Sequence, residues 1–443
     1  MNYLIGLDMG TTAIKGILMS VGGNVVNTVT GGYNYIVKEN QKLLDPKEFL
    51  DVCFSTIRKL AEGLKEGDKV LSVCSCCASG NLVVLGENYE PITPIIGWQT
   101  SVSEEDKNAF FTKKEQDDFY PTVGWPLTKG FPALCLAAIK LHKPELIEKA
   151  RFVTMNAEYL NFALTGKWGI SHSMGTPFYL MDQASGTYNK PLLEKLGISE
   201  DMLPPIYDKG TVLGTLTTDA AERLGLSTDT KVVLGSFDHP SGAMGSGVFE
   251  EGEMLLSCGT SWVEFFPVSS REFAISTKGL VDRFMLDGAP YCVMKSITSV
   301  SEKIDALRLH YLGKIPHSEN DELLRGSKLG CNGLRFNFTE EDYTKAEGYS
   351  RSDVARAIIE GAALILKENL ENLEKCGLSA DRITMIGGIS NSAECVRVVS
   401  EVLGRPIRVA NGQAAGAVGA ALLGGIGAGI YKNEKDAFSV INN

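Results

Sequence analysis

Apolar residues recur along this chain in two patterns, one typical of strands and one typical of helices. Between residues 3 and 30 the apolar runs are short and broken by glycines, which predicts three strands in a meander. A helix is then predicted with Asp45 as its cap, Pro46 at its first position and Glu48 completing a capping box. The apolar face of this helix repeats at helical spacing and consists of Phe49, Val52, Cys53, Ile57 and Leu60.

Strands and helices continue to alternate toward the end of the chain. Buried strands are predicted at residues 70–78, 82–85, 231–235, 254–257 and 261–266. Helices are predicted at residues 352–376 and 392–403, and a third, with a face of small residues, within 410–431. A strand and turn with Gly-Thr at its tip occurs in both halves, so we expect two α/β lobes with a boundary near residues 240–250.

The composition is that of an acidic folded protein with reduced cysteines. The 443 residues are 44% hydrophobic and carry a net charge of -11, which argues against a nucleic-acid partner. Cys74, Cys76 and Cys77 lie in a valine-rich run, so we interpret them as strand residues, with a metal or iron–sulfur site as the alternative. Because no export signal precedes the first strand and residues 410–431 are rich in Gly and Ala, we expect a cytoplasmic protein without a membrane partner.

Three strand-and-turn segments, at residues 4–12, 255–261 and 383–388, together predict a nucleotide site. Glycine lets backbone amides approach phosphate oxygens, and neighbouring hydroxyls add donors. The candidate nucleotide-binding residues are Gly10, Thr11, Thr12, Gly259, Thr260, Ser261, Gly387 and Gly388. Phosphoryl transfer needs positioning, charge neutralisation and a base for the incoming hydroxyl, so the segments predict a kinase.

Three charged residues are candidates for the chemistry. Asp8 lies too close to the predicted phosphates to be tolerated without a cation between them, so we assign it to Mg²⁺ held through water. Lys15 either offsets phosphate charge or is a solvated strand lysine. Asp238 follows a buried strand and precedes small residues, so it is the candidate general base, with a simple helix cap as the alternative.

The chain resembles the FGGY carbohydrate kinases, which belong to the actin/hexokinase/heat-shock-70 superfamily, and among them the xylulokinase-like members. The matching motifs follow in the family's order at residues 8–15, 235–247, 257–261, 356–361, 387–406 and 417–421. The resemblance covers essentially the entire chain. It implies two ribonuclease-H-like, actin-like ATPase lobes with the active site in the cleft between them.

The same resemblance implies the division of labour between the lobes. Residues 1–244 would form a sugar-binding and phosphate lobe, and residues 245–443 a nucleotide-binding lobe. ATP and Mg²⁺ would be the cofactors, and Asn391 in the adenosine motif would be a further nucleotide contact. The expected partners are a small sugar and ATP, and a homodimer is an open possibility.

The sequence departs from the family pattern where the sugar would bind. The usual Gly-Gln-Met-His-Gly loop corresponds to residues 76–80, so the common histidine is Ser79. The usual Trp-x-Asp is Trp98-Gln99-Thr100, and His239 replaces the Asn or Gln after the base. The expected sugar contacts are Ala78, Ser79, Trp98, Gln99, Asp238 and His239. The acceptor therefore stays open, with a ketose such as a pentulose, or a related polyol, as the leading expectation.

Two other functions stay open from the sequence. An ATPase of the same superfamily could act on a protein partner, as a chaperone-like ATPase or a dehydratase activator with a cysteine-bound cluster. A relative that binds sugar without catalysis is suggested by the altered sugar loop. The intact Asp8, Asp238 and phosphate turns favour the kinase.

Overall fold

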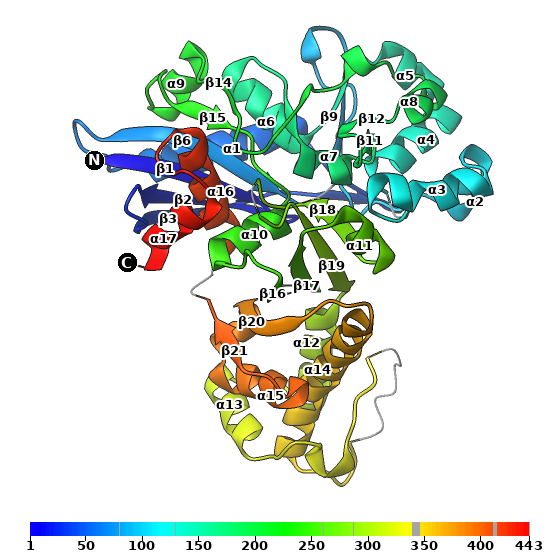
Figure 1. The fold of residues 1–443 in the computed structure, drawn as a ribbon, viewed down its shortest axis with the longest axis vertical. Coiled ribbons are helices and arrows are strands. Elements are labelled where there is room, and N and C mark those ends of the chain that lie inside the picture. Colours follow the sequence, from blue (N-terminus) through cyan, green and yellow to red (C-terminus); the bar gives the residue numbers. More distant parts are fainter. Residues whose placement is uncertain are drawn as a thin grey trace. The chain divides into compact units, whose positions relative to one another are not determined.

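The computed structural model describes residues 1–78, 80–128, 130–259, 261–286, 288–338, 346–410 and 414–442 (Figure 1). Their contacts divide the chain into two compact units. The first comprises Met1–Gly247, Leu280–Tyr291 and Ala414–Asn443, and the second comprises Val248–Gly279 and Cys292–Gln413. By packing, the C-terminal segment thus belongs with the N-terminal half, whereas the assignment of sugar and nucleotide binding to residues 1–244 and 245–443 stays a prediction.

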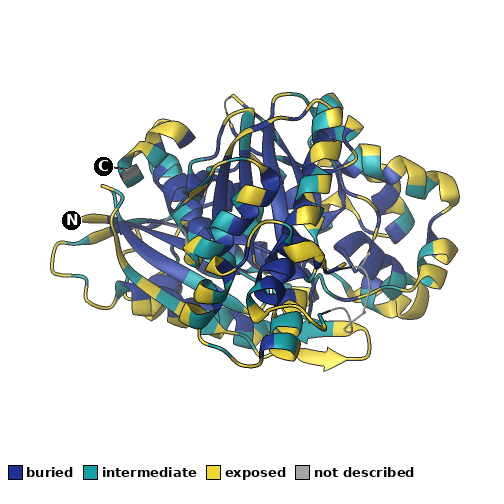
Figure 2. Cartoon of the chain, turned by 90° about the horizontal axis from the view of Figure 1, so that it is seen from below, coloured by how far each residue is buried: buried dark blue, intermediate teal, exposed yellow. Residues whose placement is uncertain are grey.

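The main sheet of the first unit has the strand order β14-β15-β6-β1-β2-β3. Its strands are β1 (Asn2–Met9), β2 (Ala13–Ser20), β3 (Val25–Gly32), β6 (Lys69–Cys77), β14 (Val212–Thr215) and β15 (Lys231–Val233). The first three form the predicted antiparallel meander, while β6 runs parallel to both β1 and β15. The carboxyl ends of β1, β6 and β15 therefore meet at one edge of the sheet. These three strands are buried along most of their length, in the buried interior that Figure 2 shows in dark blue.

Smaller sheets and helices complete the first unit. A five-stranded sheet has the order β4 (Ile36–Lys38), β5 (Gln41–Leu44), β8 (Ile95–Ile96), β7 (Leu82–Leu85) and β9 (Phe152–Met155). The short strands are β10 (Ile170–Ser171), β11 (Met181–Asp182), β12 (Thr187–Tyr188), β13 (Ile206–Tyr207) and β18 (Leu280–Arg283). The helices are α1 (Pro46–Ala61), α2 (Glu104–Phe110), α3 (Lys113–Val123), α4 (Pro132–His142), α5 (Pro144–Lys149), α6 (Asn156–Thr165), α7 (His172–Phe178), α8 (Lys190–Leu196), α9 (Thr218–Leu224), α10 (Asp238–Ser246), α16 (Ala415–Gly427) and α17 (Glu434–Ser439).

Helix α1 begins as predicted, with one difference at its cap. The Asp45 carboxylate accepts a hydrogen bond from the Glu48 amide at 2.8 Å, and Pro46 occupies the first helical position. The Glu48 carboxylate does not complete the expected capping box. It accepts hydrogen bonds from the backbone and side-chain amides of Asn34, at 3.0 and 2.8 Å. A longer-range partner therefore wins over the local one.

Helix α16 is the small-residue helix predicted within 410–431, and it packs backbone to backbone against β1 and α10 (Figure 1, in red). A β-carbon on Gly6 of β1 would overlap the Ala417 carbonyl, and one on Gly419 would overlap the Ser241 carbonyl. Glycine is required at both places because the backbones leave no room for a side chain. None of the helices in the described part of the chain has the length and apolar character needed to span a bilayer.

The second unit is built on a mixed sheet in which β19, β17, β16, β20 and β21 follow one another. These strands are β16 (Gly252–Cys258), β17 (Trp262–Val268), β19 (Tyr291–Ile297), β20 (Ala380–Gly387) and β21 (Ile407–Val409). The helices are α11 (Arg271–Ser276), α12 (Val300–Leu312), α13 (His317–Arg325), α14 (Arg351–Lys375) and α15 (Ala393–Leu403). The predicted helices at 352–376 and 392–403 are confirmed, and α15 ends at Gly404 in the left-handed conformation (φ 69°).

Candidate active site

Asp8 is the penultimate residue of β1 and lies between two neighbouring strands of the first unit. Its register partner on β2 is Lys15, and its partner on β6 is Cys76. Helix α16 closes on it so tightly that a β-carbon on Gly416 would lie 2.6 Å from Asp8 Oδ2. Burial raises the pKa of Asp8 to about 6, and the Asp238 carboxylate adds to this rise against the smaller opposing effects of Cys76, Lys15 and His239.

Asp238 is the first residue of α10, at the same edge of the sheet. The residue before it, Phe237, pairs with Cys77 in a parallel bridge that continues from β6. The Asp238 side chain is 27% exposed, yet its Oδ1 atom is buried and accepts no hydrogen bond from any described residue. Burial raises the pKa of Asp238 to about 7, although the backbone amides of Asp238 and His239 favour the charged form.

His239 lies beside this carboxylate in an uncharged form at neutral pH. Its Nε2 atom is 3.9 Å from Asp238 Oδ1, and its ring meets the Phe237 ring edge-on at 5.2 Å. Burial lowers the pKa of His239 to about 4. A neutral imidazole has one donor and one acceptor nitrogen, so it can hydrogen-bond a neutral hydroxyl in either sense.

The residues predicted to bind sugar are engaged with other parts of the first unit. Ala78 is buried and its amide donates to the Met9 carbonyl at 2.9 Å, whereas Ser79 lies outside the described residues. Trp98 Nε1 donates to Thr11 Oγ1 at 3.1 Å, which joins a predicted sugar contact to the turn that carries Gly10 and Thr12. The Gln99 side chain accepts a hydrogen bond from Lys42 Nζ at 2.7 Å, so its amide oxygen already has a partner.

The nucleotide motifs of the second half come together within the second unit. Strands β16 and β20 run parallel with Cys258 opposite Gly387, so Gly259 and Gly388 follow at the same sheet edge. Gly387 has a φ of 103°, and a β-carbon there would overlap the Cys258 carbonyl, so the close approach of the two turns requires glycine.

Several further contacts define these two turns. Ser301 Oγ donates to the Gly259 carbonyl at 2.6 Å, and Ser261 Oγ accepts from the Ser299 amide at 3.4 Å. Gly388 begins a short 3₁₀ helix that ends at the exposed Asn391. Thr260 lies outside the described residues.

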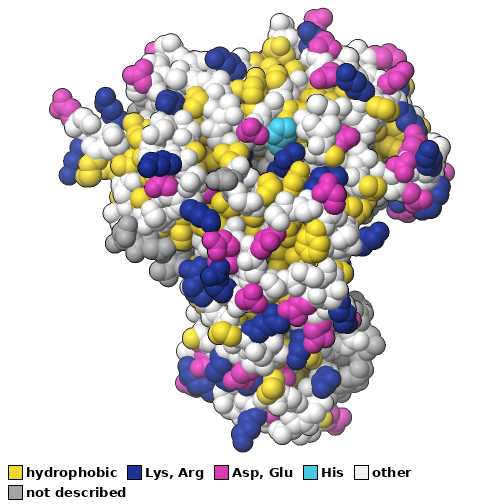
Figure 3. Space-filling model, in the orientation of Figure 1, with side chains coloured by type: hydrophobic (Ala, Val, Ile, Leu, Met, Phe, Trp, Pro, Cys, Tyr) yellow, Lys and Arg dark blue, Asp and Glu magenta, His cyan; other side chains and the backbone are white. Residues whose placement is uncertain are grey.

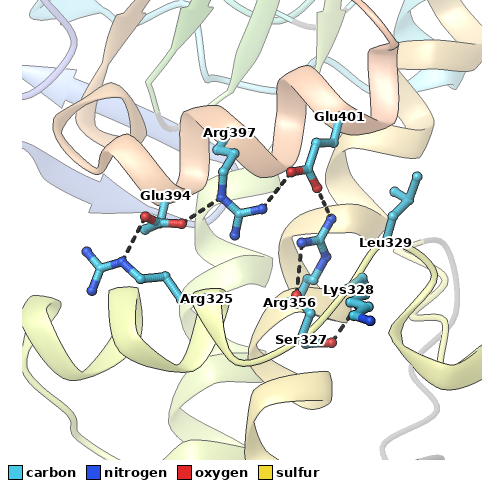
Figure 4. A pocket seen from close by; sticks show the side chains of 8 residues that line it. All are labelled: Arg325, Ser327, Lys328, Leu329, Arg356, Glu394, Arg397 and Glu401. Carbon is cyan, nitrogen blue, oxygen red and sulfur yellow. Dashed lines mark hydrogen bonds and ion pairs between the residues drawn. The ribbon is translucent and has the colours of Figure 1, made fainter.

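A separate pocket of about 360 Å³ lies on α13, α14 and α15 of the second unit (Figure 4). It is lined by Arg325, Ser327, Lys328, Leu329, Arg356, Glu394, Arg397 and Glu401. Arg356 is 1% exposed and pairs with Glu360 at 2.6 Å and with Glu401. Arg397 joins Glu401 to Glu394, which in turn pairs with Arg325. The pocket walls are therefore a network of ion pairs that ties the three helices together.

Several residues of the site were not anticipated from the sequence. Asn81 Oδ1 accepts from the Trp98 amide at 3.0 Å, and Asn156 Oδ1 accepts from the Cys77 thiol at 3.2 Å. Ser173 and Asp282 form a buried pair next to Phe237. No local pattern marks these residues, because each acts through a partner far away in the chain.

Cys74, Cys76 and Cys77 are free thiols buried on β6, which confirms their interpretation as strand residues.

Comparison with known proteins decides the family. The FGGY family of carbohydrate kinases matches this chain through its N-terminal domain over residues 3–245 and through its C-terminal domain over residues 339–428. The chain belongs to this family. The xylulose kinase of Staphylococcus epidermidis is 25% identical to this chain over 450 residues, which cover 97% of this chain and 88% of that protein.

Other relatives share the whole length as well. The autoinducer-2 kinase of Klebsiella pneumoniae is 25% identical to this chain over 475 residues, covering 97% of this chain and 87% of that protein. The crystal structure of the xylulose kinase from Lactobacillus acidophilus superimposes with a TM-score of 0.90 at 22% identity, covering 99% of this chain and 92% of that chain.

Family membership confirms the predicted enzyme class and fold. The protein is an ATP-dependent carbohydrate kinase with the mixed α/β architecture of the actin-like ATPases. The alternatives of an ATPase that acts on a protein partner and of a relative without catalysis are thereby set aside. On the face drawn in Figure 3, Lys and Arg side chains are interspersed with Asp and Glu.

Proposed function

We propose that this kinase transfers the γ-phosphoryl group of ATP to a hydroxyl of a small ketose, such as a pentulose, or of a related polyol, with Asp238 as the general base. The observation that carries the proposal is Asp238 Oδ1, a buried carboxylate oxygen that accepts no hydrogen bond from the described residues. A buried acceptor without a partner is costly unless a ligand supplies one. A substrate hydroxyl is the donor that this position would take.

The chemistry that this carboxylate performs is simple. The acceptor hydroxyl donates to Asp238, its proton passes to the carboxylate, and its oxygen forms the new bond to phosphorus as the bond to ADP breaks. Because burial raises the pKa of Asp238 to about 7, the carboxylate is a better base than an exposed aspartate. The neutral His239 beside it would hydrogen-bond a neighbouring hydroxyl and orient the sugar.

The residues around Asp8 fit a bound Mg²⁺. The Asp238 carboxylate raises the cost of ionising Asp8, and a divalent cation would offset that cost. The described residues contain no group of three or more His, Cys, Asp or Glu side chains suited to a metal. Mg²⁺ often uses one or two carboxylates and keeps most of its water and phosphate ligands, so a site that offers Asp8 alone suits it. When bound, the ion would neutralise charge on the phosphates.

The nucleotide contacts follow from the two glycine-turn regions. We assign phosphate binding to Gly10, Thr11, Thr12 and Lys15 in the first unit, and to Gly259, Thr260 and Ser261 in the second. The turn at Gly387 and Gly388, with Asn391 after it, is assigned to the adenosine. The support within each unit is geometric. Gly10 follows the carboxyl end of β1 beside the parallel β6, and Gly259 and Gly388 follow the carboxyl ends of the parallel β16 and β20, where open α/β sheets bind ligands.

The acceptor is the least constrained part of the proposal. Resemblance to the two xylulose kinases favours a pentulose, while the autoinducer-2 kinase is equally similar. We assign selectivity to Ser79, Gln99 and His239, where this chain departs from the family pattern. Because the Gln99 side chain accepts a hydrogen bond from Lys42, a change at either residue would alter how Gln99 is held.

The test is an ATP-coupled screen across ketoses, aldoses and polyols, run on the full chain with Mg²⁺. We expect one small ketose or polyol to be phosphorylated with a kcat/KM at least about tenfold above the next acceptor, since hydroxyl recognition allows large discrimination. Preferred phosphorylation of an aldose or an aldonic acid would contradict the acceptor class. Light scattering of the same preparation would show whether the kinase is a monomer or a homodimer.

A further inference from the structure

The backbone immediately before Asp238 is held by a side chain from another helix. Phe237 is the N-cap residue of α10, and its apolar side chain makes no capping hydrogen bond. Its amide instead donates to Ser173 Oγ at 3.1 Å, in a fully buried setting. Its carbonyl accepts from the Ser241 amide at 3.2 Å and begins the helix. Phe237, the residue before Asp238, is therefore held at its carbonyl by α10 itself and at its amide by Ser173.

Ser173 is in turn held by a buried carboxylate. Ser173 Oγ donates to Asp282 Oδ2 at 2.8 Å, which leaves its oxygen free to accept from Phe237. Asp282 is fully buried on β18, beside α7, which carries Ser173 (Figure 1). The Arg283 amide donates to its Oδ1 at 2.8 Å, and Thr176 also donates to the carboxylate. Three donors keep Asp282 in one orientation, so it fixes the hydroxyl rotor of Ser173.

We propose that Asp282 and Ser173 are positioning residues for the general base: they form a relay that holds the Ser236–Phe237 peptide, fixes the backbone of Phe237 and thereby sets the direction of the Asp238 carboxylate. The inference rests on the proposed role of Asp238. Neither residue touches the reacting atoms, so both act only through geometry. A displacement of a reacting group by about 1 Å can cost on the order of 100-fold in rate, so residues that only hold the base in place can have a large effect on kcat.

The chain path gives the relay an unusual source. Asp282 belongs to Leu280–Tyr291, the short segment of the first unit that interrupts the sequence of the second. Its neighbour Val281 is anchored equally firmly, since its carbonyl accepts from Trp125 Nε1 at 3.1 Å and from Gln183 Nε2 at 2.9 Å. Two hydrogen bonds that do not involve Ser173 therefore hold the segment at the Val281 carbonyl, next to Asp282.

The experiment compares Ser173→Ala and Asp282→Leu with a matched loss of a buried hydrogen bond elsewhere in the first unit. Tyr188→Phe supplies that control, because the Tyr188 hydroxyl donates to the Pro204 carbonyl at 2.6 Å. We expect Ser173→Ala to lower kcat by roughly 10- to 100-fold while the KM for ATP stays within about twofold. Tyr188→Phe should leave kcat within about twofold, whatever it does to the melting temperature.

Two further variants separate positioning from folding. Asp282→Asn keeps an oxygen that can accept from Ser173, so it should retain most of the kcat that Asp282→Leu loses. If the two residues act in series, Ser173→Ala combined with Asp282→Leu should be no slower than the slower single variant. If Asp282→Leu fails to fold, the comparison of Ser173→Ala with Tyr188→Phe still decides.

The outcomes distinguish the relay from the base itself. Equal kcat values for Ser173→Ala and Tyr188→Phe, measured on folded protein, would overturn the relay. That result, combined with an inactive Asp238→Asn variant, would leave the proposed function intact. An active Asp238→Asn variant would instead contradict both the assignment of Asp238 as the base and the relay that depends on it.

Discussion

The indole Nε1 of Trp98 donates a hydrogen bond to Thr11 Oγ1 at 3.1 Å, and this bond joins the two binding functions proposed for the first unit. Thr11 stands in the turn assigned to phosphate, and Trp98 in the segment assigned to sugar. The Trp98 amide is itself held by Asn81 at 3.0 Å. A ligand that moves one of these residues must therefore affect the other.

We predict that Trp98→Phe raises the KM for ATP as well as the KM for the sugar. The variant keeps an aromatic ring but loses the donor, and a hydrogen bond of this kind contributes about 1 kcal/mol, or roughly fivefold in affinity. Thr11→Ser keeps the hydroxyl and serves as the matched control, with both constants close to those of the parent. A change confined to the sugar KM would show that the bond does not couple the two segments.

We predict that Asp8→Asn impairs the use of Mg²⁺ and ATP far more than sugar binding. The change removes the negative charge proposed to hold the metal through water, so the Mg²⁺ concentration for half-maximal rate should rise by about tenfold or more. Calorimetric titration of sugar in the absence of ATP should give the parent affinity. An unchanged Mg²⁺ dependence would reduce Asp8 to a carboxylate at the end of a strand.

The stability of the kinase should fall as pH rises, in part through Glu158. This side chain is 1% exposed, its Oε2 has no partner among the described residues, and burial raises its pKa from 4.5 to about 8. The folded state therefore binds a proton between these values that the unfolded chain has released. Stability is lost across this window at up to about 1.4 kcal/mol per pH unit for one proton.

Glu158→Gln removes this titration at nearly constant volume. In urea unfolding, we expect the free energy of unfolding of the variant, relative to that of the parent, to be higher at about pH 8 than at about pH 5. At about pH 5 both folded proteins are neutral at this site. Parallel stability curves for parent and variant over that range would mean that Glu158 stays charged in the folded state.

The buried arginine of the second unit should be important for stability. Arg356→Met leaves Glu360 without its ion-pair partner, and loss of one member of a buried pair costs about 3–5 kcal/mol. Arg325→Met is the matched control, because Arg325 is 59% exposed and its pair with Glu394 should contribute about 1 kcal/mol at most. Similar losses in chemical denaturation of the two variants would contradict the network drawn in Figure 4.

Features specified by nearby residues were predictable from the sequence. The meander of β1 to β3, the Asp45 cap of α1 and the stop at Gly404 each depend on residues within a few positions of one another. Asp8 and Asp238 were found because each lies near or after the end of a strand and is followed by glycine or small residues. The parallel sheets then bring such strand ends together, whatever the length of chain between them.

Features that depend on distant partners were not predictable. The Glu48 carboxylate leaves the local capping box for Asn34, and Gln99 turns to Lys42, 57 residues away. The bond from Ser173 to Asp282 spans 109 residues, and Ser173 lies on a helix of only seven residues. Nothing in the local sequence favours these pairs over their alternatives, because tertiary packing selects them.

The role of Asp238 as general base is tested by the rate of sugar-phosphate formation by Asp238→Asn at saturating ATP, Mg²⁺ and acceptor. We predict a fall in kcat of about 10²- to 10⁴-fold, as for removal of a general base, with the Kd for ATP unchanged. The amide keeps the size of the side chain, so a folding defect would appear separately in the melting temperature. A kcat within about threefold of the parent would contradict the assignment of Asp238 as the base.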